Sequence, residues 1–129
     1  MSEHPLYADS SAITKLIVQE AESDALQTAV EGRLLVTSEL ALVEVRRAVQ
    51  LSDPELLPRA DRFLRECALI PISRSQVEAA ALIVTQQIRA LDAIHLAAAL
   101  GVDVAEMAVY DHRLAAAALE HGLKVLAPS

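Results

Sequence analysis

Short apolar runs alternate with helix-length segments along this 129-residue chain, and this alternation is the strongest constraint on its fold. The runs are rich in Leu, Val, Ile and Ala, and each is bounded by helical spacing or turn signals. Buried strands that alternate with helices predict a mostly parallel sheet with helices on both faces. The expected strands are residues 6–8, 34–37, 69–72, 108–110 and 124–126. We therefore predict one α/β domain over residues 1–129, with about five strands.

Helical patterns fill the intervals between these strands. Ser23 is expected to cap a helix that stops at Gly32, and Ser38 to cap the helix after the second strand. A capping box starting at Ser73 predicts another helix. Its buried stripe is expected to consist of Val77, Ala80, Ala81, Val84 and Ile88. The remaining helices are expected near residues 13–17, 58–67, 91–100 and 114–120.

Composition limits the core and the partners. The chain is 53% hydrophobic with only two Tyr and one Phe, so its core must be aliphatic. A net charge of −7 argues against a protein that coats nucleic acid, but it does not exclude a nuclease, because acidic residues gathered at a metal site are neutralised when ions bind. The lone Cys67 is expected to be a small buried hydrophobe. With neither a signal pattern nor an apolar run of roughly 20 residues, we expect a cytoplasmic protein without a membrane partner.

Basic residues are concentrated in one 20-residue window. Five of the 11 lie there, namely Arg46, Arg47, Arg59, Arg62 and Arg65. They form either a phosphate-facing patch or an ordinary solvated helix face, and the second reading is favoured by the pattern alone.

Two aspartates follow predicted strands. Asp9 comes directly after the first strand and Asp111 after the fourth. Ligands of open α/β sheets bind beyond the carboxyl ends of the strands, so both residues are candidates for chemistry. The structural alternative is that each merely caps the helix that follows it.

A third acid, Glu44, lies on the apolar stripe of its helix, in line with Leu40 and Ala48. A buried carboxylate is costly unless it is neutralised, paired or bound to metal, which favours a functional role. A salt bridge with Arg47, or a place at the edge of the stripe, is the alternative.

The fourth acid, Asp92, opens a helix that also carries His95 one turn later. Asp92 is either a helix-dipole partner or a carboxylate aimed by a rigid helix start. For His95, a buried histidine held by a hydrogen bond is favoured over a metal ligand. Four carboxylates without thiolates suit Mg²⁺ or Mn²⁺, and such ions activate water for phosphodiester hydrolysis.

Four segments together resemble the PIN domain, in particular its VapC-type toxin branch. They are YADSSAITK at residues 7–15, TSELALVEVRR at 37–47, RALDAIHLA at 89–97 and YDHRL at 110–114. They occur in the order of the family and span nearly the whole chain.

This resemblance implies a five-stranded parallel sheet, an acidic pocket holding one or two Mg²⁺ or Mn²⁺ ions, and endonucleolytic cleavage of RNA. The implied catalytic and metal-binding residues are Asp9, Glu44, Asp92 and Asp111. The implied supporting hydrogen-bonders are Ser10 and Ser38, and the implied substrate contacts are Lys15, Arg46 and Arg47. The resemblance also implies a VapB-type antitoxin as partner, and a homodimer.

One position departs from the pattern, and two alternatives remain open. Many relatives carry Thr or Ser where this chain has Val109, so a hydrogen bond that supports Asp111 is expected to be missing.

One alternative function is that of a non-catalytic PIN-like binding module. The other is a phosphatase of the haloacid dehalogenase type, which needs a second Asp where this chain has Ser11.

Overall fold

Five parallel strands form the sheet of the computed structural model, which describes residues 4–84 and 88–129. Their order is β3-β2-β1-β4-β5, so the predicted parallel sheet is confirmed. The strands are β1 (Leu6–Ala8), β2 (Leu35–Ser38), β3 (Ala68–Ile70), β4 (Glu106–Ala108) and β5 (Lys124–Leu126). The order reverses between β1 and β4, which places a topological switch point beside the carboxyl end of the central strand.

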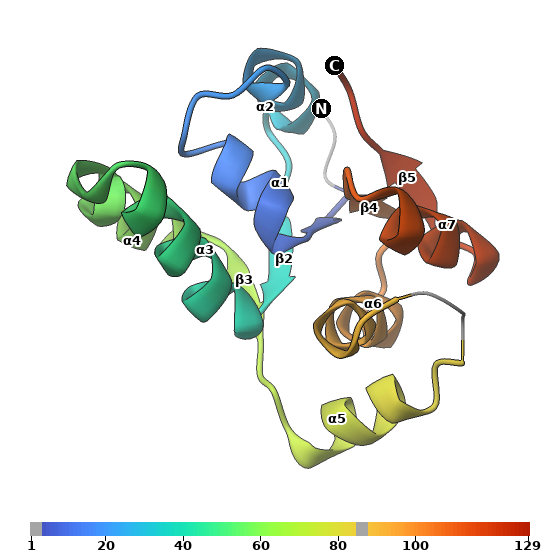
Figure 1. Cartoon of the computed structure of the whole chain (residues 1–129). Coiled ribbons are helices and arrows are strands. Elements are labelled where there is room, and N and C mark those ends of the chain that lie inside the picture. The colour runs from blue at the N-terminus through green and yellow to red at the C-terminus, as the bar shows by residue number, and fades with distance from the viewer. Residues whose placement is uncertain (1–3, 85–87) are drawn as a thin grey trace.

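Helices cover both faces of this sheet, as predicted. Figure 1 shows α1 and α2 above the sheet and α6 below it. The first face packs against α1 (Ser10–Lys15), α2 (Ser23–Val30), α3 (Leu40–Ser52) and α4 (Leu57–Glu66), with the short 3-10 helix η1 (Pro54–Leu56) between the last two. The second face packs against α6 (Ala90–Gly101) and α7 (His112–Glu120), and α5 (Arg74–Ala81) lies on α6.

Alternation along β1 divides the interior into two aliphatic cores. Leu6 and Ala8 point into the core beneath α1 to α4, whereas Tyr7 points into the core beneath α6 and α7. Successive side chains of a strand face opposite sides, so three residues suffice to anchor both layers. None of the helices among the described residues is long and apolar enough to cross a lipid bilayer.

Three of the five strands have bounds that differ from the prediction. The second strand is shifted by one residue, to Leu35–Ser38 in place of residues 34–37. The fourth strand was expected at residues 108–110 but spans Glu106–Ala108, because its register with β1 pairs Tyr7 with Met107. Tyr110 leaves the ladder, and its hydroxyl donates a hydrogen bond to the carbonyl of Pro128 at 2.7 Å. The third strand likewise begins one residue earlier than expected and ends at Ile70. Apolar runs continue past the paired residues here, so hydrophobicity alone misplaces the ends.

The predicted cap of α2 is wrong. Ser23 is the first residue of the helix and Glu22 precedes it as the N-cap. The Ser23 hydroxyl accepts from the backbone N–H of Glu20 at 2.8 Å and donates to the carbonyl of Val18 at 3.2 Å. It therefore closes the loop before the helix. The predicted cap of α3 is displaced in the same way, because Glu39 is its N-cap, while the hydroxyl of Ser38, one residue earlier, accepts from the N–H of Leu40 at 3.0 Å.

The predicted stripe of α5 is only partly confirmed, since Ala80 is buried but Ala81 is exposed. The helix starts as expected, with the Ser73 hydroxyl accepting from the N–H of Gln76, but it ends at Ala81. Val77 is 47% exposed and Val84 is 88% exposed. Residues 85–87, inside the predicted helix, lie outside the described residues, and Ile88 beyond them is not helical. The buried contact with α6 is made by small residues instead, namely Ala80, Ala93 and Ala97.

Candidate functional site

Asp9 and Asp111 lie beyond the carboxyl ends of β1 and β4, at the switch point. Asp9 is 5% exposed, and its Oδ1 accepts from the backbone N–H of Ala12 at 2.9 Å and from the Ser11 hydroxyl at 3.0 Å. Asp111 is exposed and accepts from the N–H of Leu114 at 2.9 Å. The capping role considered from the sequence is therefore real at both positions. Capping is not the whole role of these two residues, because both carboxylates also line one hollow.

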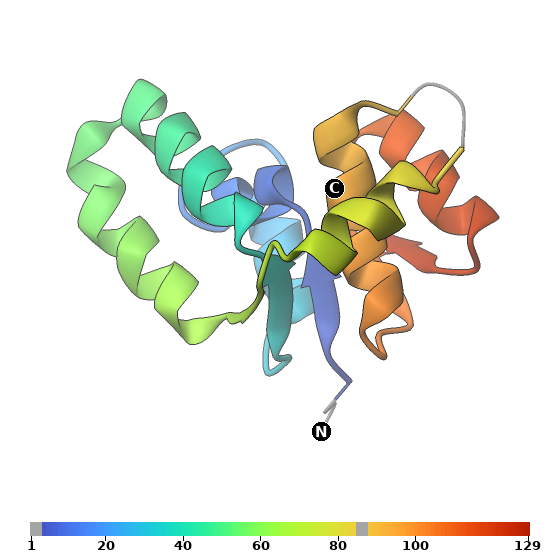
Figure 2. The same cartoon turned by 90° about the horizontal axis from the view of Figure 1, so that it is seen from below.

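Glu44 and Asp92 reach the same hollow from helices on opposite faces of the sheet. Glu44, in the middle of α3, accepts from the Ser10 hydroxyl at 2.6 Å and lies 2.8 Å from His95 Nε2. The salt bridge considered between Glu44 and Arg47 is absent from the ion pairs of the described residues. Asp92 lies in the first turn of α6. Figure 2 shows α3 and α6 on either side of β1 and β2.

Two adjoining hollows share three of these acids. The inner hollow, of about 310 Å³, is lined by Asp9, Ser10, Ser11, Thr14, Glu44, Ala48, Asp92, His95 and Asp111. The outer hollow, of about 700 Å³, is lined by Glu44, Arg89, Ala90, Leu91, Asp92, Asp111 and Arg113. The structure thus brings together all four predicted carboxylates, with two arginines in the lining of the larger hollow.

Burial and mutual repulsion set the charges of these acids. Burial raises the pKa of Asp9, although the hydrogen bond from the Ala12 N–H opposes the shift. Burial also raises the pKa of Asp92, and the nearby Asp111 charge adds to it. For Glu44, burial pushes the pKa upward, but the hydrogen bonds from His95 and Ser10 outweigh it and lower the pKa. The hollow therefore holds negative charge that a cation would relieve.

The donor chemistry fits a divalent cation, but the side chains are not a complete coordination shell. Among residues 4–84 and 88–129, no group of three His, Cys, Asp or Glu side chains is placed to hold one ion together. Mg²⁺ needs no such group, since it keeps several waters and is bound by one or two carboxylates together with substrate phosphates. Oxygen donors around a hollow of this size meet that requirement.

Sequence reasoning missed several residues of the site. His95 is buried and held by hydrogen bonds, which is the role that the sequence favoured. Its partner Tyr7, however, had been assigned only to a strand. Thr14 lines the inner hollow. Arg89 and Arg113 line the outer hollow, and their closeness in sequence to Asp92 and Asp111 was the signal that could have found them.

The remaining predicted residues lie away from the four carboxylates or are held by other groups. Ser38 is buried at the end of β2, where its hydroxyl accepts from the N–H of Leu40. The Lys15 ammonium forms ion pairs of 2.9 Å with Glu20 and Glu22. Arg46 pairs with Asp61 at 3.0 Å, and Arg47 is exposed. Roles for Lys15 and these arginines in substrate binding stay predictions.

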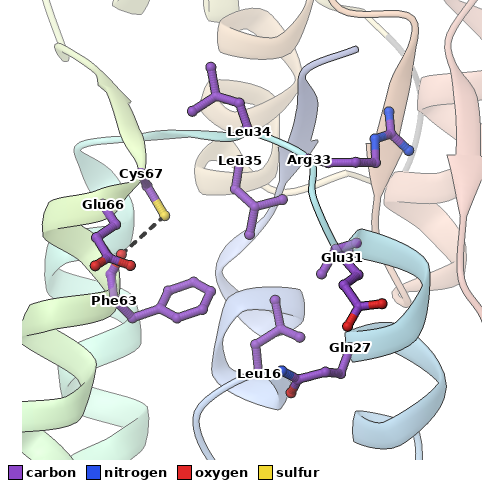
Figure 3. A pocket seen from close by; sticks show the side chains of 10 residues that line it. Leu16, Gln27, Glu31, Arg33, Leu34, Leu35, Phe63, Glu66 and Cys67 are labelled. Carbon is purple, nitrogen blue, oxygen red and sulfur yellow. Dashed lines mark hydrogen bonds between the residues drawn. The ribbon is translucent and has the colours of Figure 1, made fainter. Parts of the chain in front are cut away.

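A separate hollow of about 270 Å³ opens between α1, α2 and α4, around the start of β2. Figure 3 shows Leu16, Leu35 and Phe63 among the side chains that line it, with Cys67 close by. The Cys67 thiol donates to the carbonyl of Phe63 at 3.5 Å, and burial raises its pKa to about 11. Such a thiol stays protonated, in agreement with the expected role as a small hydrophobe.

Comparison with known proteins gives the same fold and a family. Ribonuclease VapC46 of Mycobacterium tuberculosis is 40% identical over 96% of this chain and 98% of its own length. Ribonuclease VapC47 of the same species is 34% identical over 95% and 96%. A toxin–antitoxin complex from Klebsiella pneumoniae superposes with a TM-score of 0.73 at 20% identity, covering 96% of this chain and 98% of that one. The crystal structure of Mycobacterium tuberculosis VapC20, described as a toxin that cleaves the sarcin-ricin loop, gives 0.73 at 15% identity over 87% and 94%. The PIN domain matches residues 6–120, and the chain belongs to the PIN-domain family as a VapC-type member.

Proposed function

We propose that this protein is a metal-dependent endoribonuclease and the toxin component of a toxin–antitoxin pair. The observation that carries the proposal is the convergence of Asp9, Glu44, Asp92 and Asp111 on one hollow at the switch point of the sheet. Full-length relatives named as VapC ribonucleases support the reaction class.

Each side chain of the site has a separate task in this proposal. Asp9, Glu44, Asp92 and Asp111 would hold one or two Mg²⁺ or Mn²⁺ ions, whose contribution when bound would be to activate water and to stabilise negative charge on the leaving oxygen. Ser10 supports the site by donating to Glu44. Arg89 and Arg113, at the outer hollow, contact the phosphates of the RNA strand, for which guanidinium groups are well suited.

Partners and location complete the proposal. Two of the similar structures are toxin–antitoxin assemblies, one of them a VapBC complex, which supports a VapB-type antitoxin for this chain. A homodimer and a cytoplasmic location, where RNA and antitoxin are both present, belong to the same proposal.

The test is cleavage of total cellular RNA by the purified, antitoxin-free protein in Mg²⁺, Mn²⁺ or EDTA. Asp9→Asn and Asp92→Asn remove one site charge each, and Asp103→Asn removes an exposed charge from the loop after α6 as a matched control. Discrete products are expected only with metal, from the wild type and the control. Metal-independent products, or wild-type activity in both site variants, contradict the mechanism. A folded wild type that cuts nothing points to a binding module.

A further inference from the structure

His95 is the buried centre of a hydrogen-bond chain that ends on a site carboxylate. Its ring is 2% exposed, with Nδ1 2.7 Å from the Tyr7 hydroxyl and Nε2 2.8 Å from Glu44 Oε1. The Tyr7 and His95 rings meet edge to face, at 76° and 5.8 Å between centroids. Both hydrogen bonds and ring packing therefore hold the imidazole in one orientation.

The direction of these hydrogen bonds follows from the groups themselves. The ionised carboxylate of Glu44 can only accept, so His95 Nε2 must carry a proton. The other ring nitrogen, Nδ1, can then accept from the Tyr7 hydroxyl. Burial raises the pKa of Tyr7 well above its usual range, so the phenol stays protonated and donates a hydrogen bond to Nδ1. The hydrogen bonds are therefore donated in one direction, from Tyr7 to His95 and from His95 to Glu44.

This series of hydrogen bonds connects the helix layers on the two faces of the sheet, each of which supplies acids to the site. Glu44 belongs to α3 on one face of the sheet, whereas His95 and Asp92 belong to α6 on the other. Tyr7 ties the imidazole to the central strand. Both Ser10 and His95 approach Oε1 of Glu44, and none of the hydrogen bonds among the described residues uses Oε2. One oxygen is thus fixed by the protein and the other remains available to a cation.

We propose that His95, anchored by Tyr7, is a positioning residue that fixes the Glu44 carboxylate for divalent-cation binding. The inference rests on the proposed function, since it assumes that Glu44 helps to hold the ion. Hydrogen-bonding groups behind a ligand orient it, and their loss typically lowers metal affinity by about 10- to 100-fold.

Calorimetric titration of the full chain with Mn²⁺ tests this role. His95→Leu removes both ring nitrogens, whereas His95→Gln offers an amide N–H to Glu44 and an amide oxygen to Tyr7. Tyr7→Phe removes only the anchoring hydroxyl. His121→Gln is the matched control, because His121 directly follows α7 and its ring, among residues 4–84 and 88–129, hydrogen-bonds only to the Ala117 carbonyl of that helix. Thermal unfolding monitors the fold, and the ¹⁵N spectrum of the imidazole in metal-free protein reports which ring nitrogen is protonated.

The expected result is a weakening of Mn²⁺ binding by about 10- to 100-fold in His95→Leu, with most of it regained in His95→Gln. Tyr7→Phe is expected to weaken binding less and to change the ¹⁵N signals of His95. A folded His95→Leu that binds Mn²⁺ like the wild type overturns the inference. If His95→Leu does not fold, unchanged affinity and unchanged ¹⁵N signals in Tyr7→Phe overturn it.

Failure of the proposed function looks different. A wild type that neither binds Mn²⁺ nor cuts RNA rejects the nuclease, and the positioning role with it. A wild type that does both, alongside an equally competent His95→Leu, rejects only the positioning role.

Discussion

At the scale of single residues, carboxylates of one hollow have opposite pKa shifts because their partners differ. Asp9 is the more deeply buried, and its hydrogen bonds do not offset the loss of water, so its pKa is raised. Glu44 receives hydrogen bonds from His95 and Ser10, so its pKa is lowered. The two residues should therefore affect folding stability in opposite directions.

Replacing Asp9 with Asn is expected to stabilise the metal-free protein at pH 7, raising its unfolding temperature by a few degrees. The amide oxygen can still accept from the Ala12 N–H, while the buried charge is gone. Because the folded pKa of Asp9 lies above its unfolded pKa, the folded state binds more protons between the two values, and stability falls as pH rises through that window. The gain should shrink as pH is lowered into it. Thermal melts in EDTA at several pH values measure this, and a destabilised variant at pH 7 contradicts it.

Glu44→Gln is expected to have the opposite sign. The folded pKa of Glu44 lies below its unfolded pKa, so its ionised form stabilises the fold above the unfolded pKa, and this contribution disappears as pH falls through the folded pKa. The variant should therefore melt lower than wild type at pH 7 and converge with it in acid. Parallel melting curves at every pH would show that the His95 and Ser10 hydrogen bonds do not favour the charged form.

At the scale of elements, the sequence predicted which segments are helices or strands better than where they end. Asp9 and Ser73 were placed correctly because their cap signals are local. The start of β4 and the buried side of α5 were not, because each depends on a partner far along the chain. The pairing of Tyr7 with Met107 sets the former, and close packing against α6 sets the latter.

The small-residue packing between α5 and α6 leads to a matched prediction. Ala80 is buried against Ala93 and Ala97, whereas the neighbouring Ala81 on the same helix is exposed. Ala80→Leu should overpack the interface between the two helices and destabilise the fold by about 1–3 kcal/mol, and Ala81→Leu should change stability by less than about 0.5 kcal/mol. Urea unfolding compares the two. Equal effects would show that the helices are not closely packed at Ala80.

The arginine-bearing helix α4 is expected to contribute to RNA binding. Arg59, Arg62 and Arg65 are all exposed and recur every three residues, so they share one side of the helix. Replacing all three with Ala should weaken binding to single-stranded RNA and reduce the slope of log affinity against log salt by about 0.7 for each phosphate that is no longer neutralised. Fluorescence anisotropy at several salt concentrations measures the slope. An unchanged slope assigns these residues to a solvated helix face.

At the scale of the whole molecule, strand order turns distant residues into one site. The reversal between β1 and β4 places Asp9 and Asp111 in the lining of one hollow, and helices from opposite faces add Glu44 and Asp92. The sequence predicted these four acids because two follow strands, one lies on the apolar stripe of a helix, where a buried charge is costly, and one opens a helix. It could not predict the link from Tyr7 to His95, 88 positions apart, since that hydrogen bond depends on how α6 crosses the sheet.

The most direct test of a metal-dependent carboxylate site follows Mn²⁺ binding and RNA cleavage in the same sample. Free Mn²⁺ is measured by electron paramagnetic resonance while RNA products are collected at each step of the titration. Occupancy and cleavage are expected to rise together in the wild type, and Asp92→Asn is expected to lose both. Cleavage that reaches its full rate before Mn²⁺ binds, or persists in a variant that binds none, would contradict such a site.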